Sequence, residues 1–305
     1  MQILLVDRGH WHAPLHLQAF AASGQPVSFP PESAEDPLEA ALAQSPELLI
    51  LLGPPGDMLR DLRRCLEAGI PVVLEKPVGR AAGELAPLAE LAQRWGAFVS
   101  VAQPHLQNRF WAVCTGEAGG PLSHLRFRLV NGSPRRYRQM GVPWVLDEQR
   151  AGGGVLRNLG IHGISAFLKA TSGRVQVHSC VLSRRLYWTE AEEYASVVLS
   201  AGGVIGHVEV GYTAALDSAS EFELTGHRRD LTVRDDGQHL NVLDRCAGQV
   251  RSEPVLPLAR RYEQFAAATL QALKADQPPP HPLADHLQAM QVIDECYAVA
   301  TWVNT

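Results

Sequence analysis

The sequence predicts an α/β protein made of two parts: a doubly wound parallel sheet followed by an α+β unit on a large, mostly antiparallel open sheet. Three observations predict this fold class. About the first hundred residues alternate short apolar runs with helical segments. From about residue 120 onward, strand-like runs follow one another with turns between them. Two helical segments then close the chain, on either side of Pro278-Pro279-Pro280.

The predicted strands of the first part are apolar along most of their length. Strands without polar alternation are buried on both faces, so we expect a parallel sheet with right-handed crossovers, as in a Rossmann domain. The expected strands are Ile3 to Val6, Pro26 to Phe29, Leu48 to Leu52, Pro71 to Leu74 and Ala97 to Val101, and the expected helices lie near 13–23, 36–44, 57–68 and 80–95.

The second part has a different rhythm, and we place the boundary so that residues 1–118 form the N-terminal domain and 119–305 the C-terminal domain. One helix is expected between Gly154 and about Thr171, and two more near 258–275 and 284–302. The expected strands are Ser123 to Val130, Val175 to Leu186, Tyr194 to Ala201, Val204 to Thr213, Ser220 to Thr225, Asp230 to Val233 and His239 to Leu243.

Composition excludes several classes of protein. The 305 residues are 46% hydrophobic and 19% charged, enough to bury a large core. The formal charge of −5 and the lack of a basic, aromatic-rich stretch argue against nucleic acid as a partner. No basic leader and no membrane-length apolar run is visible, so a cytoplasmic protein that does not enter membranes is expected. The scattered cysteines predict reduced thiols, with neither a disulfide framework nor a thiolate zinc site: Cys65, Cys114, Cys180, Cys246 and Cys296.

The stretch from Pro71 to Pro77 places a lysine directly after a buried strand. Open α/β sheets bind ligands at this carboxyl edge. If burial lowers its pKa, Lys76 can hold a substrate hydroxyl and exchange its proton. A cis bond before Pro77 would fix the direction of the loop. On these residues alone, a solvated lysine at a strand end is an equal alternative.

A glycine-rich segment, Gly152-Gly153-Gly154, opens the next candidate helix. Asn158 and His162 follow four residues apart, so they share one face of a helix. An amide and an imidazole beside a ligand suit hydroxyl recognition and proton transfer. A histidine that only packs in the core is the alternative. Arg157 is expected to be a surface or interface charge. Gln103 and His105 follow the fifth strand, from where they could reach the active site, but ordinary polar residues of a hinge are the favoured interpretation.

Taken together, these features resemble the glucose-fructose oxidoreductase/inositol dehydrogenase (Gfo/Idh/MocA) family over nearly the whole chain. The most specific element is Glu75-Lys76-Pro77; the glycine-rich helix with His162 and the closing helix from Pro282 add to it. The resemblance implies an NAD- or NADP-binding Rossmann domain, hydride transfer to or from a sugar, cyclitol or related small molecule, and a homodimer or homotetramer formed through the C-terminal sheet.

The resemblance also implies roles for individual residues. Lys76 matches the catalytic lysine, and His162 matches the histidine of a lysine, aspartate and histidine set. Asn158 stands where the family commonly has Asp, and an amide cannot supply the charge that raises the basicity of a neighbour. The proton-transfer role therefore falls on Lys76 and His162 or is weakened, and Lys76, Asn158 and His162 are the expected catalytic residues. With Trp144 they are also the expected substrate contacts. Trp144 and Asp147 lie in the loop before the glycine-rich helix, which in this architecture runs over the cleft, so an aromatic and a carboxylate contact with a polyol are expected there.

The turn after the first strand departs from the family's Gly-x-Gly-x-x-Gly pattern, whose glycines fall on Asp7, Gly9 and His12. Only Gly9 is kept, at the position that lets the backbone approach a pyrophosphate. Asp7 would repel the phosphates unless it turns away or caps the helix. The expected cofactor contacts are Gly9, His10, Trp11, Pro54, Glu75 and Lys76.

The second strand is short and rich in proline, and Glu32 is the acid available near it to hold a ribose. Because no arginine is present there to meet a 2′-phosphate, NAD is favoured over NADP. His12 and His16 lie one helical turn apart, a spacing that can present two imidazoles to one metal ion. No third ligand is linked to them by sequence, so no metal site is expected.

The sequence thus predicts an NAD(P)-dependent oxidoreductase acting on a hydroxyl or carbonyl of a small polar molecule. The alternative is a non-catalytic or cofactor-independent descendant that serves as a binding or scaffold protein. Asp7, His12 and Asn158 favour the alternative, whereas the presence of both Lys76 and His162 favours the enzyme.

Overall fold

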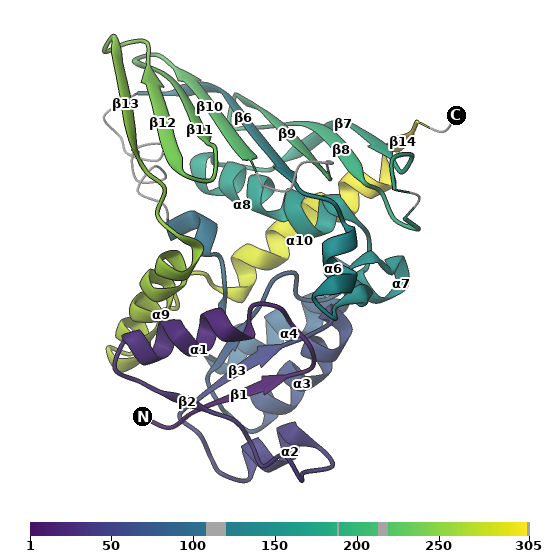
Figure 1. The fold of residues 1–305 in the computed structure, drawn as a ribbon, viewed down its shortest axis with the longest axis vertical. Helices are drawn as coiled ribbons and strands as arrows, with labels where there is room; N and C mark the ends of the chain where they lie inside the picture. The colour runs from purple at the N-terminus through teal and green to yellow at the C-terminus, as the bar shows by residue number, and fades with distance from the viewer. Residues whose placement is uncertain (108–119, 188, 213–218, 304–305) are drawn as a thin grey trace.

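A computed structural model of the chain describes residues 1–107, 120–187, 189–212 and 219–303. Two sheets lie at opposite ends of the molecule, with helices packed between them and around the smaller sheet (Figure 1). The predicted α/β fold class is confirmed. The proposed boundary between residues 118 and 119 lies outside the described residues, as does Cys114, and the division into two domains stays a prediction.

The smaller sheet has five parallel strands in the order β2-β1-β3-β4-β5. All five predicted strands are present, each within two residues of the expected ends. The direction in which successive strands are added reverses between β1 and β3. Open α/β sheets bind ligands at such a switch point. The strands are β1 Ile3–Asp7, β2 Val27–Ser28, β3 Leu48–Leu52, β4 Val72–Leu74 and β5 Val99–Val101, and the helices between them are α1 Ala13–Ala22, α2 Pro37–Leu42, α3 Pro55–Glu67 and α4 Ala82–Trp95.

Both faces of this sheet are buried, as the unbroken apolar strands predict. Along β1, Leu4 and Val6 join the core under α3 and α4, whereas Ile3 and Leu5 join a second core. That second core is completed by α9 (Leu258–Lys274), which lies beside α1 (Figure 1). The helix from the end of the chain therefore covers the sheet formed by the beginning of the chain.

The larger sheet has nine strands in the order β13-β12-β11-β10-β6-β9-β8-β7-β14. Its neighbours are antiparallel except for the β6–β9 and β7–β14 pairs. All seven predicted strands are present, and β13 and β14 are additional. The strands are β6 Leu122–Asn131, β7 Gln176–Ser183, β8 Tyr194–Ala201, β9 Val204–Tyr212, β10 Ala219–Gly226, β11 Arg229–Asp235, β12 His239–Asp244, β13 Gln249–Pro254 and β14 Ala300–Trp302.

Two predicted helices differ from the structure. The last helix, α10, spans Leu283–Ala298, and residues 300–302 form β14 beside β7 instead of continuing it. The helix after Gly154 is not uniform, because Leu156–Gly160 is a π-helical turn that precedes α8 (Ile161–Ala170). Such widened turns often occur at functional sites, and this one carries Asn158.

Helix α8 lies close against the larger sheet (Figure 1). A Cβ at Gly163 of α8 would lie 2.5 Å from the Phe127 ring of β6, and a Cβ at Gly206 of β9 would lie 2.6 Å from the Phe167 ring of α8. Only glycine permits this close approach of α8 to the larger sheet.

The segment between β6 and Gly152 contains short elements that the sequence did not predict. They are α6 Arg135–Gln139, a 3-10 turn at Pro143–Leu146 and α7 Glu148–Ala151. Elements this short show no complete hydrophobic period.

The cysteines in the described part of the chain are free thiols. Within the same residues, no helix combines the length and apolar character needed to cross a bilayer.

Candidate functional site

Lys76 lies just after β4, at the carboxyl edge of the smaller sheet, and is 5% exposed. Its Nζ donates hydrogen bonds to the Asn158 carbonyl oxygen at 2.9 Å and to Asn158 Oδ1 at 3.3 Å. Burial lowers the pKa of Lys76 from 10.5 to about 8, although the charge of Glu75 opposes this shift. The bond to Pro77 is cis. The alternative of a solvated lysine is therefore wrong.

Asn158 connects this lysine to two tyrosines. Its Nδ2 donates to the hydroxyl of Tyr137 at 2.9 Å and of Tyr212 at 3.4 Å. These bonds use the amide protons, which leaves both oxygens of Asn158 free to accept from Lys76. Because an amide carries no charge, it orients the ammonium group without raising its pKa as a carboxylate would.

His162 lies near the start of α8 and is 3% exposed. Its ring lies 4.1 Å from that of His105, centroid to centroid. Burial lowers the pKa of His162 well below 6.5 and that of His105 to about 3, so both rings are neutral at neutral pH. Among the described residues, His162 Nδ1 has no hydrogen-bond partner. The expectation that His105 is an ordinary hinge residue is wrong, because it packs against the candidate catalytic histidine.

The side chain of Asp7 stabilises the turn between β1 and α1 by hydrogen bonds to its backbone. Its Oδ1 accepts hydrogen bonds from the backbone N–H groups of Gly9 and His10, both at 2.9 Å. Desolvation raises the pKa of the Asp7 carboxyl, although these two bonds oppose the shift. Asp7 thus caps the turn rather than the helix, because the N-cap residue of α1 is His12 and Asp7 does not bond to the helix. Its carboxylate holds N–H groups at the position where a pyrophosphate is expected.

Aromatic side chains pack over the same turn. Trp11 stacks on His10 with ring centroids 4.1 Å apart, and Trp144 Nε1 donates to the Gly9 carbonyl at 3.0 Å. Trp11 also meets the ring of Tyr137 edge-on at 5.4 Å. A small cavity remains between these rings and the π-helical turn. Its lining includes Trp11, Pro77, Trp144, Gly153, Gly154 and Asn158. The turn after β1, the strand end at Lys76 and the π-helical turn therefore meet at one place.

Glu75, beside the lysine, is fully buried in a hydrogen-bond network. Its Oε1 accepts from His16 Nε2 at 3.0 Å, from His12 Nδ1 at 3.3 Å and from the Tyr262 hydroxyl, and its Oε2 accepts from the Lys76 backbone N–H at 3.1 Å. Burial alone would raise the pKa of Glu75, but the interactions with His12 and His16 outweigh it and lower the pKa well below 4.5. No sequence signal linked Tyr262 to this network.

His10, His12 and Glu75 also place possible ligand atoms within 4.8 Å of one another. The hydrogen bonds that these three residues already make favour a hydrogen-bond network over a metal ion. His10 Nδ1 accepts from the His12 backbone N–H at 3.1 Å, which leaves the ring proton on Nε2. His12 and Glu75 already bind each other and Tyr262. The absence of a metal site stays a prediction.

The turns after β1 and β3 touch at the switch point. A Cβ on Gly53 would lie 2.8 Å from Arg8 Cβ, and Pro54 follows as the N-cap residue of α3. The Arg8 guanidinium pairs with Asp61 at 2.5 Å and with Asp36 at 3.6 Å. An arginine therefore does lie near the end of the smaller sheet, although not in the second strand, and two carboxylates hold it.

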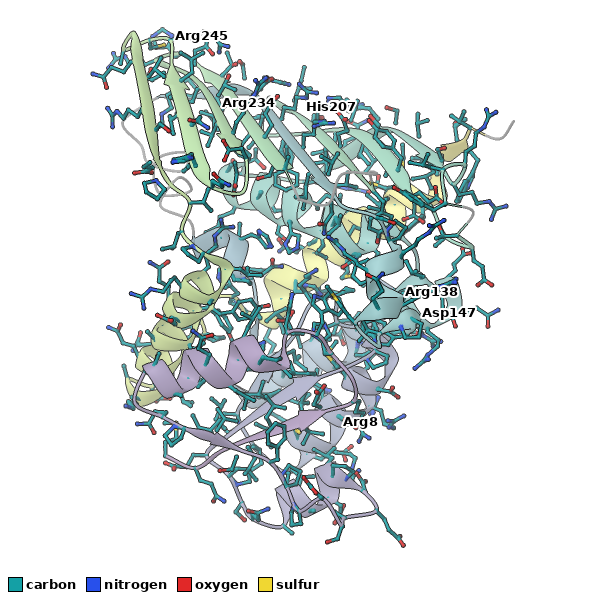
Figure 2. The ribbon with its side chains drawn as sticks, in the orientation of Figure 1. Arg8, Arg138, Asp147, His207, Arg234 and Arg245 are labelled. Carbon is teal, nitrogen blue, oxygen red and sulfur yellow. The ribbon has the colours of Figure 1, made fainter. Side chains whose placement is uncertain are left out.

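Two expectations about neighbouring residues are wrong. Arg157 is buried, not on the surface: it pairs with Asp294 at 2.7 Å and donates from Nε to the Gly152 carbonyl at 2.6 Å. Asp147 does not face the cavity, because its carboxylate caps α7 through the N–H groups of Gln149 and Arg150. Figure 2 shows Asp147 near the outer edge of the molecule.

Comparisons with known proteins agree with this architecture. The model of the GFO/IDH/MocA C-terminal domain matches residues 113–232. No curated protein sequence matches the chain. Among solved structures, an oxidoreductase domain protein from Kribbella flavida shares 17% identity with a TM-score of 0.81, covering 98% of this chain and 96% of its own. Levoglucosan dehydrogenase, solved with NADH and L-sorbose, shares 15% identity with a TM-score of 0.81 over the same shares.

A third similar structure is KijD10, a 3-ketoreductase from Actinomadura kijaniata solved with NADP and TDP-benzene. It shares 15% identity with a TM-score of 0.74, covering 99% of this chain and 98% of its own. At these identities the likeness shows the fold.

Proposed function

We propose that this protein is an NAD(P)-dependent oxidoreductase acting on a hydroxyl or carbonyl of a small polar molecule, and the match of residues 113–232 to the GFO/IDH/MocA C-terminal domain model supports this. The observation that carries the proposal is the buried Lys76, whose pKa is lowered to about 8 and whose Nζ is held by Asn158 near His162. The solved structures with bound NADH or NADP support the choice of cofactor.

Each residue of the site has a chemical role in this proposal. For oxidation, neutral Lys76 takes the proton from the substrate hydroxyl, while NAD(P) supplies the hydride acceptor. The oxygens of Asn158 keep Nζ in position. Neutral His162, whose Nδ1 has no partner among the described residues, hydrogen-bonds a substrate hydroxyl. For reduction, protonated Lys76 returns the proton to the carbonyl oxygen.

The turn after β1 fits a dinucleotide with one rearrangement. Gly9 has a φ of +90°, and a Cβ placed on it would meet nothing within 4 Å, so backbone and ligand can approach there. The N–H groups of Gly9 and His10 become available to a phosphate once Asp7 turns away. Gly9, His10, Trp11, Pro54, Glu75 and Lys76 remain the residues proposed to hold the cofactor.

The experiment measures binding first and turnover second. NADH and NADPH are titrated into the purified protein and followed by calorimetry and by tryptophan fluorescence. Sugars, cyclitols and their acids are then screened for reduction of NAD(P). Lys76→Met is expected to lower kcat at least 100-fold, whereas Lys274→Met, which removes an exposed lysine from the end of α9, keeps full activity.

Two outcomes contradict the proposal. One is no binding of either nucleotide at millimolar concentration by folded protein, which would favour the binding or scaffold alternative. The other is full turnover by the Lys76→Met variant. We also propose, from the family resemblance, a cytoplasmic homodimer or homotetramer formed through the larger sheet, and sedimentation analysis measures its size.

A further inference from the structure

Arg136 of α6 has unusual surroundings for a half-buried arginine. Its guanidinium contacts neutral oxygens: Nη1 donates to Asn131 Oδ1, and Nη2 donates to the Tyr137 hydroxyl at 3.3 Å. The guanidinium carbon lies 5.0 Å from the centre of the Tyr137 ring. Its hydrogen-bond and cation–π partners in the described part of the chain, Asn131 and Tyr137, are both uncharged.

Six other shielded arginines in the described part of the chain are neutralised by carboxylates. Each of the following pairs with at least one Asp or Glu carboxylate within 4.0 Å: Arg8, Arg64, Arg126, Arg128, Arg157 and Arg261. Holding a charge away from water without a counter-charge costs free energy unless a ligand compensates it. Arg136 is therefore placed to receive an anion.

The position of Arg136 connects it to the candidate catalytic residues. The Tyr137 hydroxyl that it contacts also accepts a hydrogen bond from Asn158 Nδ2 at 2.9 Å, and Asn158 holds Lys76. The Tyr137 ring packs against Trp11 and Tyr212, at centroid distances of 5.4 and 6.0 Å. The positive charge thus contacts the same tyrosine hydroxyl as Asn158, the residue that holds the reacting lysine.

We propose that Arg136 binds a carboxylate of the substrate, so that the substrate is a sugar acid oxidised or reduced at one of its hydroxyl-bearing carbons. This inference rests on the proposed function and names its substrate class. A guanidinium has five N–H donors in a planar fork, so the two used on Asn131 and Tyr137 leave others for a carboxylate. The single charge matches a carboxylate better than a doubly charged phosphate ester, which shares the same oxyanion chemistry.

The probes are sugars that differ only in this group. D-glucose is compared with D-glucuronate, D-galactose with D-galacturonate, and D-glucose 6-phosphate represents the phosphate ester. Binding is measured by calorimetry with and without NAD⁺, and kcat/KM is measured wherever turnover occurs. In the wild-type protein we expect at least one uronate to bind at least tenfold more tightly than its neutral hexose and than the phosphate ester.

The variants separate Arg136 from its neighbours. Arg136→Met is expected to reduce the preference for the uronate at least tenfold and to leave the affinity for neutral hexoses within twofold. Arg138→Met is the matched control, because Arg138 belongs to the same helix, carries the same charge and is exposed near the outer edge of the molecule (Figure 2). Arg136→Gln repeats the test if the methionine variant melts at a lower temperature.

Three results overturn the inference: wild-type protein that binds neither uronate, a preference for the phosphate ester, or an unchanged uronate preference in both Arg136 variants. Failure of the proposed function has a different signature. Uronate binding that depends on Arg136, with no nucleotide binding and no turnover, would refute the oxidoreductase and keep the carboxylate site. Turnover of neutral sugars that depends on Lys76 but not on Arg136 would do the reverse.

Discussion

Replacing Asp7 by glycine is expected to tighten the binding of NADH or NADPH by about 10- to 100-fold. The Asp7 carboxylate holds the N–H groups of Gly9 and His10 at 2.9 Å each, so a phosphate must displace it before using them. A hydrogen bond to a charged group contributes about 1.5–3 kcal/mol. A carboxylate left within about 5 Å of a phosphate charge would add about 3 kcal/mol of repulsion at an effective dielectric constant of about 20.

Solvent and salt screen part of this effect, because Asp7 and Gly9 are exposed. A net gain of about 1.4–2.8 kcal/mol remains, which corresponds to the stated 10- to 100-fold change. The assay is calorimetric titration with each nucleotide at two salt concentrations. Asp7→Asn keeps a capping oxygen without the charge, so it separates repulsion from competition for the N–H groups.

Glu67→Gln serves as the control, since it removes one negative charge from an exposed position at the end of α3. This variant is expected to bind both nucleotides as the wild type does. If Asp7→Gly binds no more tightly than the wild type, the carboxylate does not compete with the pyrophosphate, and our placement of the phosphates at this turn is wrong.

The remaining predictions concern Lys76 and the network around Glu75. In the oxidation direction, kcat/KM should rise with pH through about 8, where Lys76 loses its proton, and a flat profile from pH 7 to 9 would exclude it as the base. Since the pKa of Lys76 is lower in the folded than in the unfolded state, this group makes stability rise between pH 8 and 10.5. Lys76→Met should therefore raise the free energy of unfolding at pH 7 by about 2 kcal/mol after the lost hydrogen bonds to Asn158 are allowed for, and urea denaturation that shows a decrease would refute this burial cost. Tyr262→Phe should lower the free energy of unfolding by about 1–3 kcal/mol, because the buried Glu75 carboxylate loses a donor, and an unchanged urea midpoint would show that this bond contributes nothing.

Most of the fold could be predicted because its signals are local. Unbroken apolar runs such as Leu48 to Leu52 require burial on both faces, and the structure buries every residue of β3. β13 was missed because all its residues are exposed, so no apolar alternation marks it. The end of α10 was misplaced because residues 300–302 pair with the edge of β7, which is distant in sequence.

The sequence by itself determined all strands of the smaller sheet, seven strands of the larger one, the place of Lys76 at a strand end and the grouping of Asn158 with His162 on one segment. Each of these follows from residues within a few positions of one another. Only the tertiary structure decided that Tyr262 completes the network of Glu75, that His105 packs on His162 and that Arg136 reaches the Tyr137 hydroxyl beside Asn158. Contacts between such distant residues depend on how α9 and α8 pack against the two sheets, and packing leaves no period in the chain for a sequence pattern to reveal.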